Sequence, residues 1–366
     1  MLRVATRNSS RVIFQRSVNI TIRLQSNFFS TSIIKSAREG TLNSFIPDVK
    51  PLGQDNTIES NVPSETNRLS RTLTKFWEKV HVKYDDKLHQ YDVQLDGKTL
   101  KTPLGFPLSL PESKRHLANL IAHEWANLPD LKVKTHSLPL TSIAARSIDL
   151  TMINNQDSVN NEMIAKVGNL EDIKLNLLRY FDTDTCLIFT THDEYKGTLR
   201  KKQDELYLPL IKEYEDFFTV YAKREGNLLP SDDSKIELEY LDCITDGLRG
   251  NKQSITTQNV VLHWLNNLPI YDLIALERAI LTSKSFLCGI TLLRSNVTDK
   301  HNLQHLYQVN RSNPDDYYHK SIDEIIELGN LETIYQTAEW GEVEDTHDVD
   351  KVDWIRNLTS AAILCH

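Results

Sequence analysis

The sequence predicts an α+β fold, with a small antiparallel β-rich N-terminal domain containing two helices, followed by a mostly α-helical C-terminal domain. Apolar residues alternate with polar ones over much of 76–110, which is the period of a half-buried strand. After residue 158 they recur at helical spacing instead. The length of 366 residues, 40% of them apolar, suits two domains. We place these at 73–158 and 159–366.

The first 38 residues have the composition of a mitochondrial presequence. They hold seven basic residues and no acidic one, are rich in Ser, and contain interspersed apolar residues rather than one apolar block. Such a segment forms a basic amphipathic helix that is attracted to anionic membrane surfaces. We therefore expect a transit peptide at 1–38 and a location in the mitochondrial matrix. The polar, Pro-containing stretch at 39–72 is expected to be a flexible linker.

The predicted domain at 73–158 begins as an antiparallel meander. Val80 and Val82 alternate with polar residues, and the same alternation returns at 91–95. Asp96 and Gly97 follow, which is a strong hairpin signal because Gly accepts the positive φ of a tight turn. Further strands are expected at 98–102 and 106–110, and apolar stripes predict helices at 111–128 and 140–152.

The predicted domain at 159–366 is built from amphipathic helices. One isolated strand is expected at 185–189, after a corner in which Asp182 and Asp184 turn the chain. The stretch at 227–239 contains a proline and four acidic residues and is interpreted as a surface excursion. The helical patterns run over 164–181, 194–222, 254–265, 270–293, 321–340 and 347–364.

Charge and hydropathy exclude two classes of partner. The whole chain has a net charge of −8, and without residues 1–38 the charge is −15, from 35 basic and 50 acidic residues. An acidic body repels phosphate backbones, so we expect no nucleic-acid partner. No apolar run approaches the roughly 18 residues that span a bilayer, so we expect no membrane insertion. The four cysteines form no C-x-x-C pair, as expected of reduced thiols.

Apparent catalytic and ligand motifs have structural explanations. Gly97, Lys98 and Thr99 resemble the end of a P-loop, but Asp92 stands where the motif requires glycine, and the triplet joins two strands. The acidic residues at 344–350 lack the central glycine of a calcium loop and the His or Cys pairs of a zinc site. Asp345 is expected to cap the last helix. We therefore expect no metal and no cofactor, and a binding protein is favoured over an enzyme.

His123 and Glu124 stand beside Trp125 and could be interpreted as an acid–base pair. We favour a structural interpretation, in which Trp125 packs in the core while His123 and Glu124 face outward.

Several short motifs stand along the chain in a characteristic order and spacing: Phe76-Trp77-Glu78-Lys79-Val80, the stretch 91–103, Ala122-His123-Glu124-Trp125, Pro139-Leu140-Thr141, Asp182-Thr183-Asp184-Thr185, Leu331-Glu332, Tyr335-Gln336 and Trp340-Gly341. Together they resemble the alpha-subunit assembly chaperones of mitochondrial ATP synthase. The resemblance covers roughly residues 73–365. It implies a mitochondrial matrix chaperone that binds newly imported alpha before alpha meets beta and covers the surface that beta later buries. It also implies a β-rich domain followed by a helical one, with no nucleotide or metal.

The resemblance also implies which residues bind the partner. The family's functional acid corresponds to Glu332, and Glu342 and Glu344 are further candidates for the same surface. Trp340 is open between a core and a contact role. The chain departs from the family's Trp-Asp-Pro at 207–209, where it has Tyr-Leu-Pro. The sequence shows no coiled coil or symmetric interface, so we expect a monomer.

Two alternatives stay open. The first is a matrix enzyme that uses Asp345 or His347 in a C-terminal carboxylate site. The second is a stable structural subunit of a respiratory complex.

Overall fold

The computed structural model describes residues 77–128, 137–155, 161–231, 233–247, 249–308, 318–343 and 346–366. All of these residues belong to one compact unit, Asn61–His366. The predicted presequence at 1–38 and linker at 39–72 lie outside the described residues, as does Phe76. The predicted domain boundary at residue 158 stays a prediction.

The small sheet is antiparallel, as the alternating pattern predicts. It is formed by β1 (Val80–Asp85), β2 (Gln90–Leu95), β3 (Lys98–Thr99) and β4 (Ser109–Pro111). The β2–β3 hairpin turns at Asp96 and Gly97, whose φ angles are 47° and 81°. The predicted hairpin between 98–102 and 106–110 forms, because Lys101 and Pro107 make an antiparallel bridge and Leu108 N donates to the Leu100 carbonyl oxygen at 2.7 Å. The meander prediction misses one feature, which is that β4 also pairs with β2. Since β1 pairs along the whole of β2, the two short strands share the other edge of β2.

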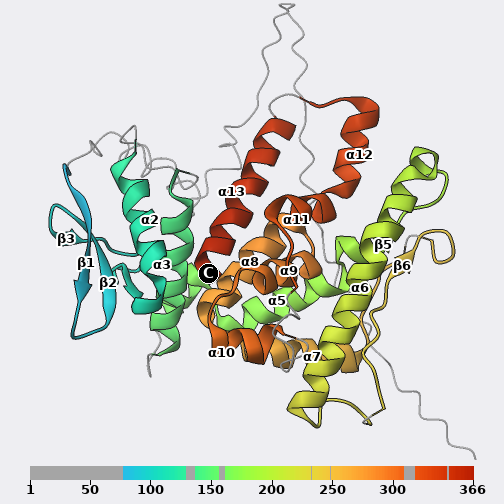
Figure 1. Ribbon diagram of the computed structural model, residues 1–366, viewed down its shortest axis with the longest axis horizontal. Coiled ribbons are helices and arrows are strands. Elements are labelled where there is room, and N and C mark those ends of the chain that lie inside the picture. Colours follow the sequence, from blue (N-terminus) through green and yellow to red (C-terminus); the bar gives the residue numbers. More distant parts are fainter. Residues whose placement is uncertain are drawn as a thin grey trace, which may run out of the picture. The chain divides into compact units, whose positions relative to one another are not determined.

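The two predicted helices of this region are α2 (Arg115–Ala126) and α3 (Pro139–Asn154). The α2 helix contacts both the sheet and α3, so it lies between them (Figure 1). Val93 of the sheet and Ile121 and Ile143 of the helices are fully buried in the shared core. Proline at the first position of α3 is favourable, because the N–H that it lacks has no partner inside a helix.

Trp125 packs as predicted, but Glu124 does not face outward. The Trp125 ring lies 5.4 Å from that of Trp77, and its Nε1 donates to Thr141 Oγ1 at 3.0 Å. The Glu124 carboxylate accepts the backbone N–H groups of Leu140 and Thr141 at 2.8 and 2.9 Å. Glu124 therefore caps α3 from another helix. The position of Glu124 beside Trp125 on α2 does not reveal this contact, because its partners lie on α3.

The rest of the described chain is mostly helical, as predicted. Its helices are α4 (Asn161–Val167), α5 (Leu170–Asp182), α6 (Thr198–Glu225), α7 (Ile255–Asn266), α8 (Ile270–Ser283), α9 (Phe286–Asn296), α10 (Lys300–Asn302), α11 (Ile322–Gly329), α12 (Leu331–Trp340) and α13 (His347–Cys365). The α8 helix packs on α13 and α9, and α3 contacts both α8 and α13. Within the described parts of the chain, every helix is too short or too polar to span a bilayer.

Three predicted helices are in fact pairs of helices. The breaks fall at Gly168 (φ 96°), at Lys284 (φ 56°), and at Asn330 between α11 and α12. The apolar period continues across each break because both helices of a pair bury a face in the same core. The periodicity therefore does not reveal the change of direction.

The predicted strand at 185–189 is also shorter than expected. Thr185–Leu187 forms a 3-10 turn, and only β5 (Ile188–Phe189) is a strand, paired in parallel with β6 (Leu241–Asp242). The predicted excursion at 227–239 is partly wrong, because Ile236 is buried and its N–H donates to Thr219 Oγ1 at 2.8 Å.

The corner before β5 is fixed by long-range hydrogen bonds. Asp184 is fully buried, and its carboxylate accepts the N–H groups of Cys186 and Leu287, both at 2.8 Å. Asp182 accepts the N–H of Gln253 at 2.9 Å. These carboxylates therefore do more than turn the chain, because they tie the corner to segments about 70 and 100 residues away.

Candidate functional site

The candidate site begins at α12, the helix that carries Glu332 and Trp340. Ser321 starts the preceding helix with a capping box closed by Glu324. Of the residues of α12, only Leu331 is fully buried, and the helix ends at Gly341, whose φ is 85°. This helix contacts α6 and α11 at its base and extends away from the helical core (Figure 1). A helix with so little buried area presents most of its surface for contact.

Glu332 and Trp340 are brought together through Tyr195. Glu332 is exposed, and its Oε1 accepts from Gln336 Nε2 at 3.0 Å. The Tyr195 ring lies 5.9 Å from that of Tyr335 and 6.0 Å from that of Trp340. Partial burial against α12, followed by the negative charge of Glu332, raises the pKa of Tyr195. Trp340 remains 74% exposed, which favours a contact role over a core role.

Tyr195 lies in a conformationally restricted turn. Tyr195, Lys196 and Gly197 have successive φ angles of 50°, 55° and 76°. A Cβ on Gly197 would lie 3.2 Å from the His192 carbonyl oxygen, so any other residue would be strained there. Left-handed conformations of non-glycine residues are costly and persist only where the surrounding structure holds them. The surrounding structure therefore holds the turn that supports α12 in this one conformation.

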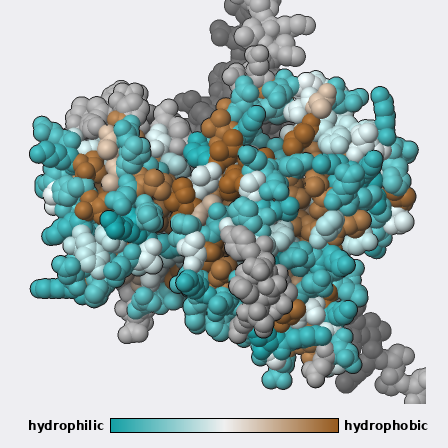
Figure 2. All heavy atoms as spheres, viewed as in Figure 1, coloured by the Kyte–Doolittle hydropathy of each residue, from teal (hydrophilic) through white to brown (hydrophobic). Residues whose placement is uncertain are grey.

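A mixed apolar and acidic surface continues from α12 to the start of α13. Figure 2 shows hydrophobic residues exposed over these helices among hydrophilic ones. Large exposed apolar patches mark interaction sites, and charged residues are typical of the rim of an interface. We name this region the C-terminal surface. Its exposed apolar residues are Ile334, Trp340, Val343, Val349, Val352 and Ile355, and its exposed acidic residues are Glu332, Glu339, Glu342, Asp348 and Asp350.

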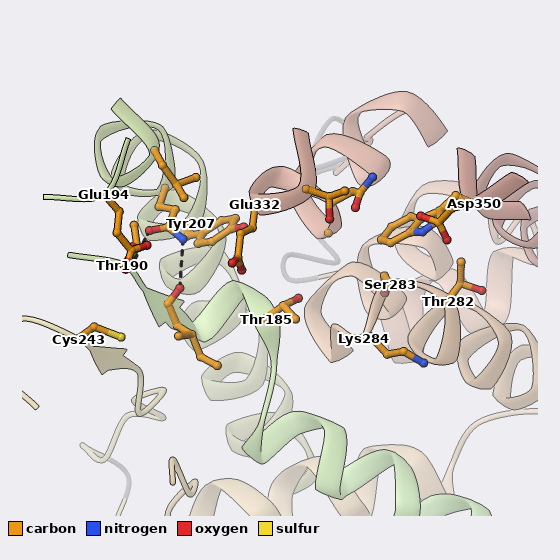
Figure 3. Close-up of a pocket in the computed structure, with 17 residues that line it drawn as sticks. Thr185, Thr190, Glu194, Tyr207, Cys243, Thr282, Ser283, Lys284, Glu332 and Asp350 are labelled. Atoms are coloured by element: carbon orange, nitrogen blue, oxygen red, sulfur yellow. Dashed lines mark hydrogen bonds between the residues drawn. The ribbon is translucent and has the colours of Figure 1, made fainter. Parts of the chain in front are cut away.

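A cavity of about 500 Å³ lies beside this surface. It is lined from α6, α8, α12 and α13 and from the segments on either side of β5. Figure 3 shows the Glu332 side chain directed into the space between Tyr207 and Thr185, with Glu194 at one end and Asp350 at the other. The Tyr207 hydroxyl donates to the Leu328 carbonyl oxygen at 3.0 Å, and burial raises its pKa.

The sequence-predicted site residues differ in how the structure places them. Glu332 and Trp340 lie on one helix and share Tyr195 as a neighbour, and Glu342 is exposed just after that helix. Glu344 and Asp345 lie outside the described residues. The partner-binding role of the four candidates stays a prediction. The sequence reasoning missed Tyr195 and Glu194, for which no local signal exists, because the fold brings them to α12 from more than 130 residues away.

The described residues contain no group of three or more His, Cys, Asp and Glu side chains that could hold a metal ion. His347 Nδ1 accepts the backbone N–H of Val343 at 2.8 Å, so it closes the loop before α13.

The chain is similar to known proteins both in sequence and in fold. The model of the ATP12 chaperone protein family matches residues 74–215. The chain is 44% identical over 332 residues to mitochondrial protein ATP12 of Saccharomyces cerevisiae, covering 90% of this chain and 95% of that protein. It is 30% identical over 293 residues to mitochondrial atp12 of Schizosaccharomyces pombe, covering 80% and 82%.

Two solved structures share the fold. Atp12 from Paracoccus denitrificans has a TM-score of 0.53 at 18% identity, covering 81% of this chain and 100% of that one. The Atu1473 protein from Agrobacterium tumefaciens has a TM-score of 0.52 at 18% identity, covering 79% and 84%. The predicted α+β fold class is thereby confirmed.

The sequence relatives decide the family. Both fungal proteins are mitochondrial and are matched over most of their length, which confirms the predicted mitochondrial location. The family is one of chaperones, so the matrix-enzyme alternative is wrong. The chain belongs to the ATP12 chaperone family, the assembly factors of mitochondrial ATP synthase.

Proposed function

We propose that this chaperone binds the unassembled alpha subunit of mitochondrial ATP synthase in the matrix, acting as a monomer. It covers the surface of alpha that beta later buries and yields to beta during assembly. The observation that carries the proposal is the C-terminal surface, where exposed apolar side chains stand beside Glu332 and other exposed acids.

The physical reason for such a chaperone is the state of alpha before assembly. A subunit that lacks its partner exposes a large apolar interface, which aggregates unless it is covered. The apolar side chains around Trp340, which is 74% exposed, can cover such a face temporarily. Acidic side chains at the rim orient a partner and speed its arrival more than they add affinity, which suits a complex that must later dissociate.

The test is capture of separately expressed alpha and beta by the chain that starts at residue 39. We expect alpha to be captured and beta not, and Glu332→Lys to weaken the capture of alpha. Asp216→Lys is the matched control, because it makes the same charge change at an exposed position of α6. Failure of the folded chain to capture alpha contradicts the proposal.

The remaining alternative, a stable structural subunit, makes a different prediction. A transient chaperone is absent from mature ATP synthase, whereas a subunit migrates with it in stoichiometric amount. Native electrophoresis of mitochondrial membranes, probed for both proteins, separates the two.

A further inference from the structure

We infer that the cavity beneath α12 is an anchor pocket for one arginine side chain presented by an apolar segment of the client. The inference rests on the proposed function, because it assigns the client chemistry at the same site. It goes further by naming a pocket, its ligand group and the residues that contact it. Four observations support it.

The first observation is the shape of the site. A volume of about 500 Å³ falls in the range of about 300–1,000 Å³ that is typical of binding pockets. It is large enough for a long side chain together with part of the backbone that carries it. It lies directly beside the exposed apolar residues of α12 and α13, so a segment held on that surface can send a side chain into it.

The second observation is charge. Of the residues that line the cavity, three carry carboxylates (Glu194, Glu332 and Asp350) and one, Lys284, carries an ammonium group. The Lys284 Nζ donates to the Leu281 carbonyl oxygen at 2.6 Å and keeps its charge, so the lining carries three negative charges against one positive charge. The pocket is therefore negative and complementary to a cation. Glu332 lies in its middle and is the direct partner, while Glu194 and Asp350 add attraction from the two ends (Figure 3).

The third observation is an unsatisfied polar atom on the wall of the pocket. Thr185 Oγ1 is buried and has no hydrogen-bond partner in the structure. Buried polar atoms are nearly always paired, and one left unpaired costs stability. In Figure 3, Thr185 lies next to the end of the Glu332 side chain. A ligand N–H that donates to Oγ1 removes this cost, so the atom is a binding group that is paired only in the complex.

The fourth observation is the aromatic lining, which favours arginine over lysine. Tyr207 is 3% exposed and Trp354 8% exposed, and both line the cavity. A guanidinium group is planar, is more weakly hydrated than an ammonium group and so loses less on entering an aromatic-walled site, and donates from several N–H groups in a fixed fork. It can therefore pair with the Glu332 carboxylate through two N–H groups and still has others to offer to Thr185 Oγ1. An ammonium group donates from a single point and does not match this arrangement as well.

The first experiment uses two fluorescent peptides and the chain that starts at residue 39. One peptide is acetyl-Leu-Ala-Arg-Ala-Leu-amide, and the other has neutral citrulline in place of arginine. Binding is followed by fluorescence anisotropy. We expect the arginine peptide to bind about tenfold more tightly, which corresponds to one charge-assisted contact. Equal binding of the two peptides overturns the inference.

Substitutions locate the contact within the molecule. Glu332→Gln is expected to abolish most of the preference for arginine, and Asp350→Asn to reduce it. Asp348→Asn is the matched control, because Asp348 lies in the same first turn of α13 but does not line the cavity. An equal loss with the control variant overturns the assignment to the pocket.

Thr185→Val separates a binding role from a structural one. Since the variant removes an unpaired buried hydroxyl, we expect its melting temperature to be unchanged or higher while its affinity for the arginine peptide falls about tenfold. If Thr185 has only a structural role, the substitution should lower both the melting temperature and the affinity for the arginine peptide, or neither of them. Unchanged peptide affinity in a folded Thr185→Val variant contradicts the inference.

Competition distinguishes failure of the inference from failure of the proposed function. If excess arginine peptide displaces bound alpha and the citrulline peptide does not, the pocket anchors alpha. If alpha stays bound under saturating arginine peptide, the inference is wrong while the proposed function stands. If alpha is not captured at all but the arginine preference is present, the pocket chemistry stands and the identity of the client is wrong.

Discussion

At the scale of single residues, buried carboxylates in this protein stabilise contacts between distant segments. Asp184 accepts two backbone N–H groups, and Asp272 accepts the Tyr307 hydroxyl at 2.6 Å. Burial raises the pKa of each to about 6, although the hydrogen bonds act in the opposite direction. Ionisation of either carboxylate therefore lowers the stability of the folded protein, even though each carboxylate accepts hydrogen bonds.

This burial predicts a pH dependence with a definite sign. Each group has a folded-state pKa above its ordinary value of 3.8, so the folded protein binds the proton more tightly than the unfolded chain. The stabilisation is complete below about pH 4 and is lost as the pH rises through about 6. Asp272→Asn keeps an oxygen acceptor for Tyr307 but cannot ionise. We expect the variant to gain up to about 3 kcal/mol over the parent between pH 4 and pH 6.5.

Urea unfolding at the two pH values measures the difference between Asp272→Asn and the parent. Asp216→Asn, at an exposed position, is the control and should follow the parent. An identical pH dependence of Asp272→Asn and the parent would show that Asp272 does not titrate in this range.

At the scale of elements, the breaks in the helical pattern position the site. The turn at Asn330 lets α12 leave the core, and the turn around Tyr195 supports it with aromatic contacts. The apolar pattern of 321–340 predicts one helix, which would place Glu332 in line with α11. The actual direction depends on Tyr195 and α6, and local residues cannot reveal it.

The support of α12 by Tyr195 can be tested directly. Tyr195→Ala removes two aromatic contacts, each worth about 0.5–1.5 kcal/mol, so α12 should open more often and bind alpha less tightly. Tyr195→Phe keeps the ring and is the control. Hydrogen exchange of the α12 amides is the measurement, and equal protection in both variants would contradict the supporting role.

The packing of α8 on α9 provides a second test at this scale. A Cβ on Gly289 would lie 2.6 Å from Ile280 Cγ1 and 2.9 Å from Leu276 Cδ1. We expect Gly289→Ala to lower the free energy of unfolding by about 1–3 kcal/mol through overpacking. Gly250→Ala is the matched control, because its Cβ would have no neighbour within 4 Å. Thermal or urea unfolding compares them, and equal stability of the two variants would refute the close approach of α8 and α9.

At the scale of the whole molecule, the family assignment predicts a cellular phenotype. Without this chaperone the exposed interface of alpha should aggregate, so alpha should be insoluble and the catalytic head unassembled. Fractionation of mitochondria from cells lacking the protein measures soluble and assembled alpha. Re-expression of the parent chain should restore both, and Glu332→Lys should restore them less. Normal amounts of assembled alpha in the deficient cells would contradict the proposed function.

The sequence by itself determined the fold class, the position of most helices and the family. These properties depend on the spacing of apolar residues, on composition and on short motifs, all of which involve residues close together in the sequence. The hairpin at Asp96–Gly97 is one feature that such local residues predict. The sequence also indicated Glu332, but only through the family resemblance, because an exposed helix acid carries no local mark of function.

The tertiary structure alone decided which residues surround Glu332. Tyr195 and Glu194 come from the turn before α6, Thr185 from the corner after α5, and Asp350 from α13. It also decided that Glu124 caps α3 and that Asp184 closes the corner onto α9. These contacts form because separate elements bury their apolar faces in one core, and that burial brings polar side chains distant in sequence into contact.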